Sequence, residues 1–498
     1  MKYRISIILL FFIGIINPSF ADYKIWEGNQ NSDWSNSANW VDGVPGANDD
    51  VIIDVKTHNP IIDNETITVR DIAIESGTLN LNSSNGLGHL ICNSIYILNG
   101  TGLVNRGEIT VNKATASMVP ECCTWWEGIR IEGTLQNSRS FAGAIEPSQT
   151  GIITVTNSFE RQTILVNASG YVFNQGDIDI TNNVDDDEAY GIWISGTSNF
   201  VSTSTSSIKI YNTESTGIYL KDEGKLTNQG LLQVSNCELN SIEIDSLSEF
   251  VNGSDGEVYL GLSDGTNQVH GILNEGSIMN FGWMAIGKTS SHGILCREQS
   301  EFENKTNAEI IVGFGSYEIG GTGVVASSAD LFLNNGKLSI LNSGNYGLNM
   351  QSTDFENSYF GNLKIGVENE VNIPNIGLRL SNSNAINYGS ITLNGISDHG
   401  ITVGGGIFTN NDNVNINDVS EHGLRLSLGG ECINNASIII NGTGESGIYI
   451  GDFAEMTNND IIETNANGAH GLLMLIGSLF NESNGILKIN DTGESGIG

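Results

Sequence analysis

The tetrapeptide Gly217-Ile-Tyr-Leu220 is the clearest copy of a phrase that recurs through most of the chain. The phrase is a glycine, an apolar residue, any residue and a second apolar residue. Copies begin at residues 128, 191, 347, 377, 423 and 447, and variants begin at 241, 271, 293, 323, 400 and 471. From residue 191 onward the intervals are 22 to 30 residues. A recurring interval of this size indicates a repeat architecture, in which each unit packs only against its neighbours.

An asparagine marks a second fixed position in the repeat. It lies 10 or 11 residues after the start of ten copies, and an alternating segment such as Lys337-Leu-Ser-Ile340 follows it. Because equivalent residues of stacked coils lie one above another, we expect each amide to hydrogen-bond to the next and to form a ladder. The ten residues are Asn228, Asn252, Asn304, Asn334, Asn357, Asn387, Asn410, Asn434, Asn458 and Asn481.

The alternation within the phrase predicts short β-strands with one buried face. Ile218 and Leu220 would point to one side of such a strand, and Tyr219 to the other. A single coil cannot bury that face, whereas stacked coils pair their strands in parallel and enclose a continuous core. The sequence therefore predicts an all-β fold, a parallel β-helix (β-solenoid) of about 15 coils over residues 63–498, ending in mid-coil. We expect it to be right-handed because right-handed examples of this fold prevail. Leucine-rich repeats, calcium-binding nonapeptide repeats and β-propellers fit less well, because their patterns are missing.

The N-terminal segment differs from the array. Residues 1–21 have a basic start, an apolar run and small residues at the end, a pattern that predicts a secretory signal peptide. Residues 22–62 contain Trp26, Trp34 and Trp40. We expect this segment to cap the first coil, because an uncovered sheet edge invites aggregation. The alternative is an exposed sugar-binding surface.

Composition limits the classes of partner. The chain has 57 acidic and 21 basic residues, a formal net charge of −36. Such a surface repels nucleic acid and anionic lipid and favours cations. No apolar run beyond the leader is long enough for a transmembrane helix. Among the six cysteines, Cys92 with Cys122 or Cys123 is the one pair that we consider for a disulfide, and Cys296 is expected in the core.

Several phrases support a resemblance to known proteins. They are Trp26-x-Gly28, Trp34-Ser35, Asn39-Trp40, Gly43-Val-Pro45, Asp50-Val-Ile-Ile53 and Trp126-Glu-Gly-Ile-Arg-Ile131. The chain resembles the secreted right-handed β-helix proteins of Bacteroidota, which are described as pectin-lyase-like or adhesin-like. This resemblance implies a secreted or cell-surface protein. The C-terminal residues 491–497 nearly repeat residues 442–448, and we interpret the sequence as a C-terminally truncated fragment that lacks an anchoring region.

The positions before each opening glycine are the candidate site. Histidine occurs there five times, at His270, His292, His399, His422 and His470. Stacking is expected to place Asp398, Glu421 and Glu445 in one acidic column. Oxygen ligands suit Ca²⁺, whereas imidazoles would suit a transition metal. The alternative is that these are polar turn residues copied with the repeat, and the acidic run of residues 185–188 has the same two interpretations.

Two functional hypotheses follow. The first is an adhesin-like or structural scaffold that binds glycans through outward aromatic and arginine residues. The second is a carbohydrate-active enzyme, a polysaccharide lyase or glycoside hydrolase, on the same fold. The enzyme hypothesis predicts that insertions in the long coils at 241, 293 and 347 meet on one side beside charged groups. The sequence identifies no catalytic and no cofactor-binding residue. The outward residues are Arg130, Trp193, Tyr219, Arg379, Arg425 and Tyr449.

Overall fold

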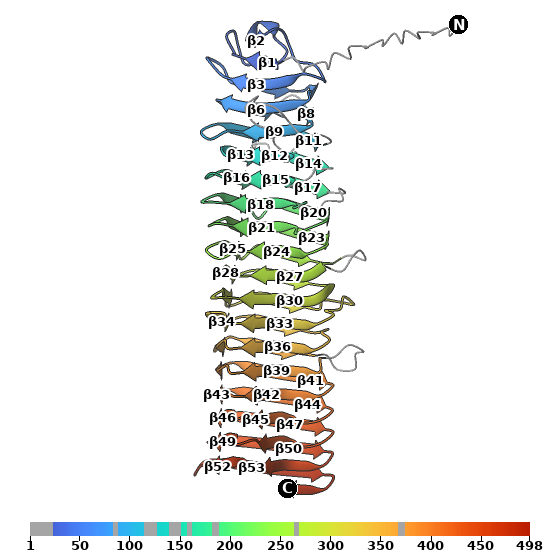
Figure 1. Ribbon diagram of the computed structural model, residues 1–498, viewed down its shortest axis with the longest axis vertical. Helices are drawn as coiled ribbons and strands as arrows, with labels where there is room; N and C mark the ends of the chain where they lie inside the picture. The colour runs from blue at the N-terminus through green and yellow to red at the C-terminus, as the bar shows by residue number, and fades with distance from the viewer. Residues whose placement is uncertain are drawn as a thin grey trace, which may run out of the picture.

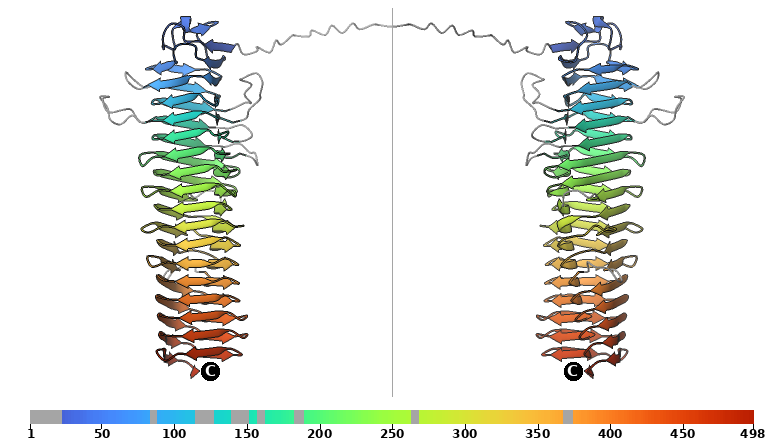
Figure 2. Two further views of the ribbon diagram at one scale, coloured as in Figure 1. Left: turned by 90° about the vertical axis from the view of Figure 1, so that its left-hand side faces the viewer. Right: turned by 90° about the vertical axis from the view of Figure 1, so that its right-hand side faces the viewer.

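Three parallel β-sheets run along the length of a single rod (Figure 1). The computed structural model confirms the right-handed parallel β-helix predicted from the repeat. The two side views show successive coils stacked directly on one another from one end of the rod to the other (Figure 2). The structure describes residues 23–82, 88–113, 127–138, 151–156, 162–181, 189–262, 268–366 and 374–498.

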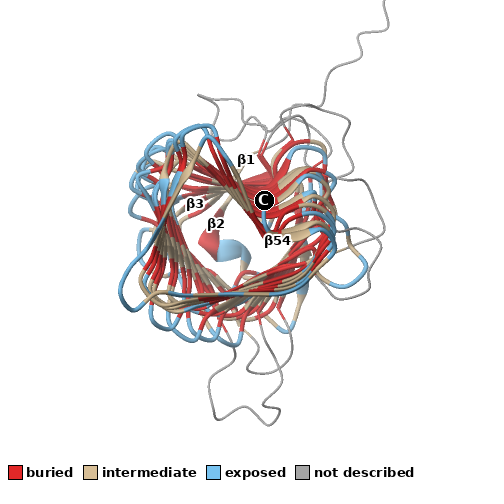
Figure 3. Cartoon of the chain, turned by 90° about the horizontal axis from the view of Figure 1, so that it is seen from below, coloured by how far each residue is buried: buried red, intermediate tan, exposed pale blue. Residues whose placement is uncertain are grey.

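One coil contributes one strand to each sheet. In the coil that opens with Gly217, β21 (Ile218–Lys221) lies in sheet A, β22 (Lys225–Asn228) in sheet B and β23 (Leu231–Cys237) in sheet C. The next coil repeats the arrangement with β24 (Asn240–Ile244) beside β21. Viewed from the end, buried residues line the inside of the coils and exposed residues gather at the corners (Figure 3).

The stack is longer than the repeated phrase indicated. In the described part of the chain, sheets B and C each contain 17 strands, so the rod has about 17 turns where the sequence predicted about 15. The additional turns lie at the N-terminal end. There β3 (Asp50–Asp54) pairs in parallel with β6 (Asp71–Ser76), although neither strand carries the glycine phrase. Strand β3 therefore belongs to the stack while lying within the predicted cap.

The three N-terminal tryptophans form a buried cluster above the first coil. Trp26 and Trp34 are fully buried, and Trp40 is nearly so. The Trp34 and Trp40 ring centroids lie 4.7 Å apart with an edge-on geometry. Strand β1 (Tyr23–Trp26) pairs with both β2 (Trp40–Val41) and β3, which ties the cluster to the stack. This burial fits a cap, and it leaves these rings unable to form an exposed sugar-binding surface.

The predicted asparagine ladder lies at the last residue of the sheet B strands from β22 to β52 (Ser478–Asn481), and its side chains point into the rod. From Asn228 to Asn458, each side-chain Nδ2 donates to Oδ1 of the next asparagine at 2.8–3.0 Å. The ladder also includes Asn280, which lies 9 residues after its opening glycine and so escapes a search at 10 or 11. Earlier in the rod Asn105, Asn137 and Asn174 are linked in the same way.

Cysteines are core residues where the structure describes them. Cys92, Cys237, Cys296 and Cys432 are buried thiols with no disulfide partner among the described residues. Burial raises the pKa of the Cys296 thiol to about 12, which keeps it protonated and unreactive. Three predictions fall outside the described residues, namely the signal peptide, a pairing with Cys122 or Cys123 and the acidic run of residues 185–188, as does Trp126 of the phrase that ends at Ile131. No helix in the described ranges is long and apolar enough to cross a membrane.

Candidate functional site

The candidate site lies at the corner where the chain leaves sheet C and enters sheet A. Here the residues that precede each opening glycine form a column, with His270 opposite His292 and His470 opposite Ser495 in the strand register. The His399 and His422 rings stack at 5.2 Å with an angle of 5° between their planes. Parallel pairing repeats the corner at each coil, so equivalent side chains are one strand spacing apart.

Backbone hydrogen bonds also align the acidic residues before these histidines. The Glu421 N–H donates to the Asp398 carbonyl at 2.9 Å, and the Glu445 N–H donates to the Glu421 carbonyl at 3.1 Å. The backbone positions of the predicted acidic column are therefore as expected. Whether the column holds a metal ion stays a prediction, because backbone alignment does not show ligation.

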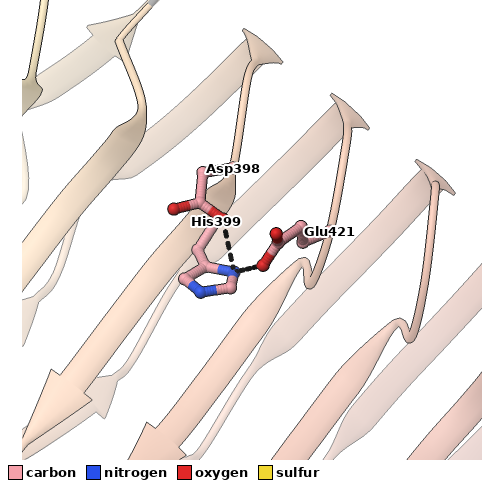
Figure 4. Close-up of side chains that lie close together, drawn as sticks. All are labelled: Asp398, His399 and Glu421. Atoms are coloured by element: carbon pink, nitrogen blue, oxygen red, sulfur yellow. Dashed lines mark ion pairs between the residues drawn. The ribbon is translucent and has the colours of Figure 1, made fainter.

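Asp398 and Glu421 flank a buried imidazole. The His399 Nδ1 atom lies 3.5 Å from Asp398 Oδ1 and 3.4 Å from Glu421 Oε2, between the two carboxylates (Figure 4). Only 4% of the His399 side chain is exposed, against 37% of Asp398 and 47% of Glu421. The three residues thus form a site with a buried nitrogen at its base and two carboxylates that solvent reaches.

Arg425 closes the other side of the ring. Its Nη1 atom lies 2.8 Å from His399 Nε2. Because a guanidinium can only donate, Nε2 is the acceptor, and the single proton of the neutral ring is on Nδ1. The Nδ1 atom and Asp398 Oδ1 are both buried without a hydrogen-bond partner. A buried polar atom in this state is destabilising and calls for an explanation.

The electrostatics of this cluster are unusual for a surface corner. Burial lowers the pKa of His399 to about 4; the Asp398 charge opposes that shift, while Arg425 and His422 add to it. A hydrogen bond with Asp398 raises the pKa of Glu421 to about 7, helped by burial and by the charges of Asp398 and Glu445. Near neutral pH Glu421 is therefore protonated part of the time, and His399 is uncharged.

Glu445 does not join this group, although the sequence placed it in the same column. Its Oε2 atom lies 3.4 Å from Nε2 of His422. In the last coils Glu494 reaches His470 in the same way at 3.5 Å. Each of these acids contacts the histidine of the preceding coil. His399 differs because it has a carboxylate from its own coil as well, which brings Asp398, His399 and Glu421 together.

Sequence reasoning missed the roles of His399 and Arg425. It treated His399 as one of five histidines before the opening glycines, and Arg425 as part of an outward glycan-binding face. The signal was available in the repeat, because Arg425 follows Gly423 by two residues and its coil stacks on that of His399. What the repeat could not supply was the direction in which the guanidinium turns.

The sequence was compared with protein-family models and with curated proteins. No family model matches it, and no curated protein matches it. The candidate site must therefore be interpreted from its own residues.

A second surface feature follows the outward positions of sheet A. In successive coils the equivalent outward residues of sheet A lie next to one another and form a continuous column, which we call the outer strip. It includes all six predicted outward residues, Arg130, Trp193, Tyr219, Arg379, Arg425 and Tyr449. Trp193 and Tyr219 lie next to each other in it, with ring centroids 4.9 Å apart. Tyr190 packs against both rings, at 4.9 and 5.6 Å. Lys221 lies 5.5 Å from the Trp193 ring centre.

The long connections of the three long coils each join a sheet C strand to a sheet A strand, and in two of them residues 263–267 and 367–373 lie outside the described residues. They connect β26 (Glu257–Leu260) to β27 (Gln268–Asn274), β32 (Glu309–Val312) to β33 (Thr322–Ser327), and β38 (Asn362–Ile365) to β39 (Ile376–Ser381). The last of them ends beside the site. The His399 N–H donates to the Asn375 carbonyl at 3.1 Å, and the Ser397 hydroxyl donates to Asn375 Oδ1 at 3.0 Å.

Proposed function

We propose that this protein is a secreted, adhesin-like β-helix scaffold that presents the outer strip of sheet A to neutral glycans. The observation that carries the proposal is the cluster of Tyr190, Trp193 and Tyr219, three half-buried aromatic side chains on adjacent coils of one face. Secretion is supported by the pattern of the first 21 residues.

The rod favours binding through a repeated surface. Adjacent coils place equivalent side chains about 4.8 Å apart on a flat sheet, so a ligand that is extended along the rod can contact several coils at once. Aromatic rings offer an apolar face at small cost in conformational entropy. The net charge of −36 disfavours polyanionic ligands, which leaves neutral glycans as the class that best fits this surface.

A glycan array followed by titration of the strongest neutral ligand tests this proposal. We expect Tyr219→Ala to weaken binding by about tenfold, the effect of removing one aromatic contact of about 1–1.5 kcal/mol. The matched control is Tyr171→Ala, because Tyr171 is an exposed aromatic residue on sheet B. Equal losses in the two variants, or no neutral glycan bound, would contradict the proposal.

A carbohydrate-active enzyme is the second candidate, and one observation favours it. The connection from β38 to β39 ends at Asn375, whose carbonyl accepts from the His399 N–H, so Asp398, Glu421 and Arg425 lie beside the end of one long connection. A carboxyl with a pKa near 7 is suited to general acid or base catalysis. Release of new reducing or unsaturated ends from a panel of polysaccharides, abolished by Glu421→Gln, would support this candidate over a scaffold. Activity that survives in Glu421→Gln would exclude this site.

A further inference from the structure

We propose that Asp398, His399 and Glu421 form a binding site for a zinc-like divalent metal, and that Arg425 competes with the metal for His399. This goes beyond glycan binding and does not depend on it. The site is made of one nitrogen and two oxygen ligands, with a remaining position for water. Three protein ligands with a fourth position for water is the number typical of accessible zinc sites, and imidazole and carboxylate are both zinc ligands.

The distances fit a small tetrahedral ion. Zinc bonds of about 2.1 Å at tetrahedral angles place neighbouring ligand atoms about 3.4 Å apart. The observed separations from His399 Nδ1 are 3.5 Å to Asp398 and 3.4 Å to Glu421. The potential ligand atoms of the three residues all lie within 4.8 Å of one another. As direct hydrogen bonds these separations are too long, since an N–H···O bond is usually 2.7–3.2 Å.

The buried His399 nitrogen is the independent evidence for a ligand. Its side chain is 4% exposed, Nδ1 has no hydrogen-bond partner, and it points between the two carboxylates (Figure 4). A divalent ion there would satisfy Nδ1 and Asp398 Oδ1 together, and the two carboxylates would balance its charge. The partial exposure of Asp398 and Glu421 provides an entry path.

The choice of zinc over calcium follows from the same ligands. Calcium takes six to eight oxygen ligands at 2.3–2.6 Å. This corner supplies two carboxylates and an imidazole, and imidazole suits transition metals. Glu445, the third carboxylate of the predicted calcium column, points instead to His422 at 3.4 Å. The geometry thus supports the transition-metal alternative considered from the sequence.

Arg425 makes the site conditional. When Nδ1 binds a metal, the ring proton moves to Nε2, and that N–H then faces the guanidinium, which cannot accept it. Arg425 must therefore move away when the metal binds. The guanidinium carbon already lies 5.9 Å from the Tyr449 ring centre, so an alternative cation–π contact is close at hand. Proteins usually place an acceptor at this second imidazole position.

The full, untagged chain competes with a chromophoric chelator for added metal, and the absorbance of the chelator reports how much metal the chain binds. Zn²⁺ and Ca²⁺ are tested separately. We expect one equivalent of Zn²⁺ to bind, with Ca²⁺ at least a hundredfold weaker. Glu421→Gln should weaken Zn²⁺ binding at least tenfold. The control is Glu494→Gln, which changes the equivalent acid beside His470 and should leave binding unchanged. Glu421 is half exposed, so its variant should fold, and a thermal melt checks this.

A second variant tests the competition itself. Arg425→Gln removes the positive charge and supplies a carbonyl that accepts the Nε2 proton, so Zn²⁺ should bind 10- to 100-fold more tightly. Weaker binding in Arg425→Gln would overturn the role of Arg425. The site itself is overturned by the absence of saturable Zn²⁺ binding, by a preference for Ca²⁺, or by equal losses in Glu421→Gln and Glu494→Gln.

Discussion

The asparagine ladder of sheet B and the histidine column at the edge of sheet A are two polar columns built by the same repeat. Each asparagine amide has a donor and an acceptor that point along the rod, so every copy satisfies the next, as in the 2.8 Å bond from Asn334 to Asn357. Imidazole nitrogens lie in the plane of the ring. When the rings of His399 and His422 stack at 5.2 Å, neither nitrogen can reach the neighbouring ring.

The difference shows what repetition alone can and cannot stabilise. An amide copied from coil to coil satisfies its own hydrogen bonds, whereas an imidazole copied in the same way depends on whatever lies beside it. The Nδ1 atoms of His270, His292, His399 and His422 are all buried without a hydrogen-bond partner. The ladder is explained by the fold, and the histidine column requires a further explanation such as a ligand.

Breaking the ladder should have the largest effect. In Asn334→Asp the side chain loses its donor, and its charge is buried against the Asn357 oxygen that it formerly bound. We expect the free energy of unfolding to fall by about 3–5 kcal/mol, the cost of an uncompensated buried charge. Equilibrium denaturation of wild type and variant at neutral pH measures it. A loss below about 1 kcal/mol would show that the ladder is not held by its amide bonds.

The fold could be predicted from the sequence because glycine and asparagine constrain the backbone corners directly. At Gly323, for example, an added Cβ would lie 2.3 Å from Ile340 Cγ2, so a side chain would not fit at this opening position. The first turns lack such markers, and β3 was placed in the cap for that reason.

The site could be predicted only as far as the backbone determines it. The backbone stacking is compatible with two trios, Asp398–His399–Glu421 and Glu421–His422–Glu445, that share one acid. Glu421 is turned towards His399 in the structure, and Arg425 is bonded to that same ring. These are choices of side-chain rotamer among exposed groups, and no sequence period encodes them.

Removing a histidine from the column should have a smaller effect that depends on pH. Burial lowers the pKa of His270 to about 4, with the charges of His292 and Arg297 adding to the shift. In the unfolded chain this imidazole takes up a proton near pH 6.5, whereas in the folded chain it does so only near pH 4. The stability that His270 contributes is therefore fully present above pH 6.5 and is lost as the pH falls towards 4. We expect His270→Phe to change stability by less than about 1 kcal/mol at pH 8, because an apolar ring replaces an unpartnered one.

The same variant should lose less stability than wild type between pH 6.5 and 4. Thermal melts of the two proteins across this range separate the histidine contribution from that of the carboxylates, which the variant retains. A parallel loss in both proteins would mean that His270 is not held neutral by the fold.

The smallest effect is expected from a ladder that is exposed to water. On the surface of the rod, Asn411, Asn435 and Asn459 form side-chain bonds of 2.8 Å from coil to coil; here each Nδ2 donates to Oδ1 of the preceding coil, the reverse of the buried ladder. Water can replace each of these bonds, so Asn435→Ala should lower the free energy of unfolding by no more than about 0.5 kcal/mol. Denaturation under the conditions used for Asn334→Asp gives the comparison. A cost comparable to that of the buried variant would mean that stacking of the coils, rather than burial, gives an asparagine ladder its stability.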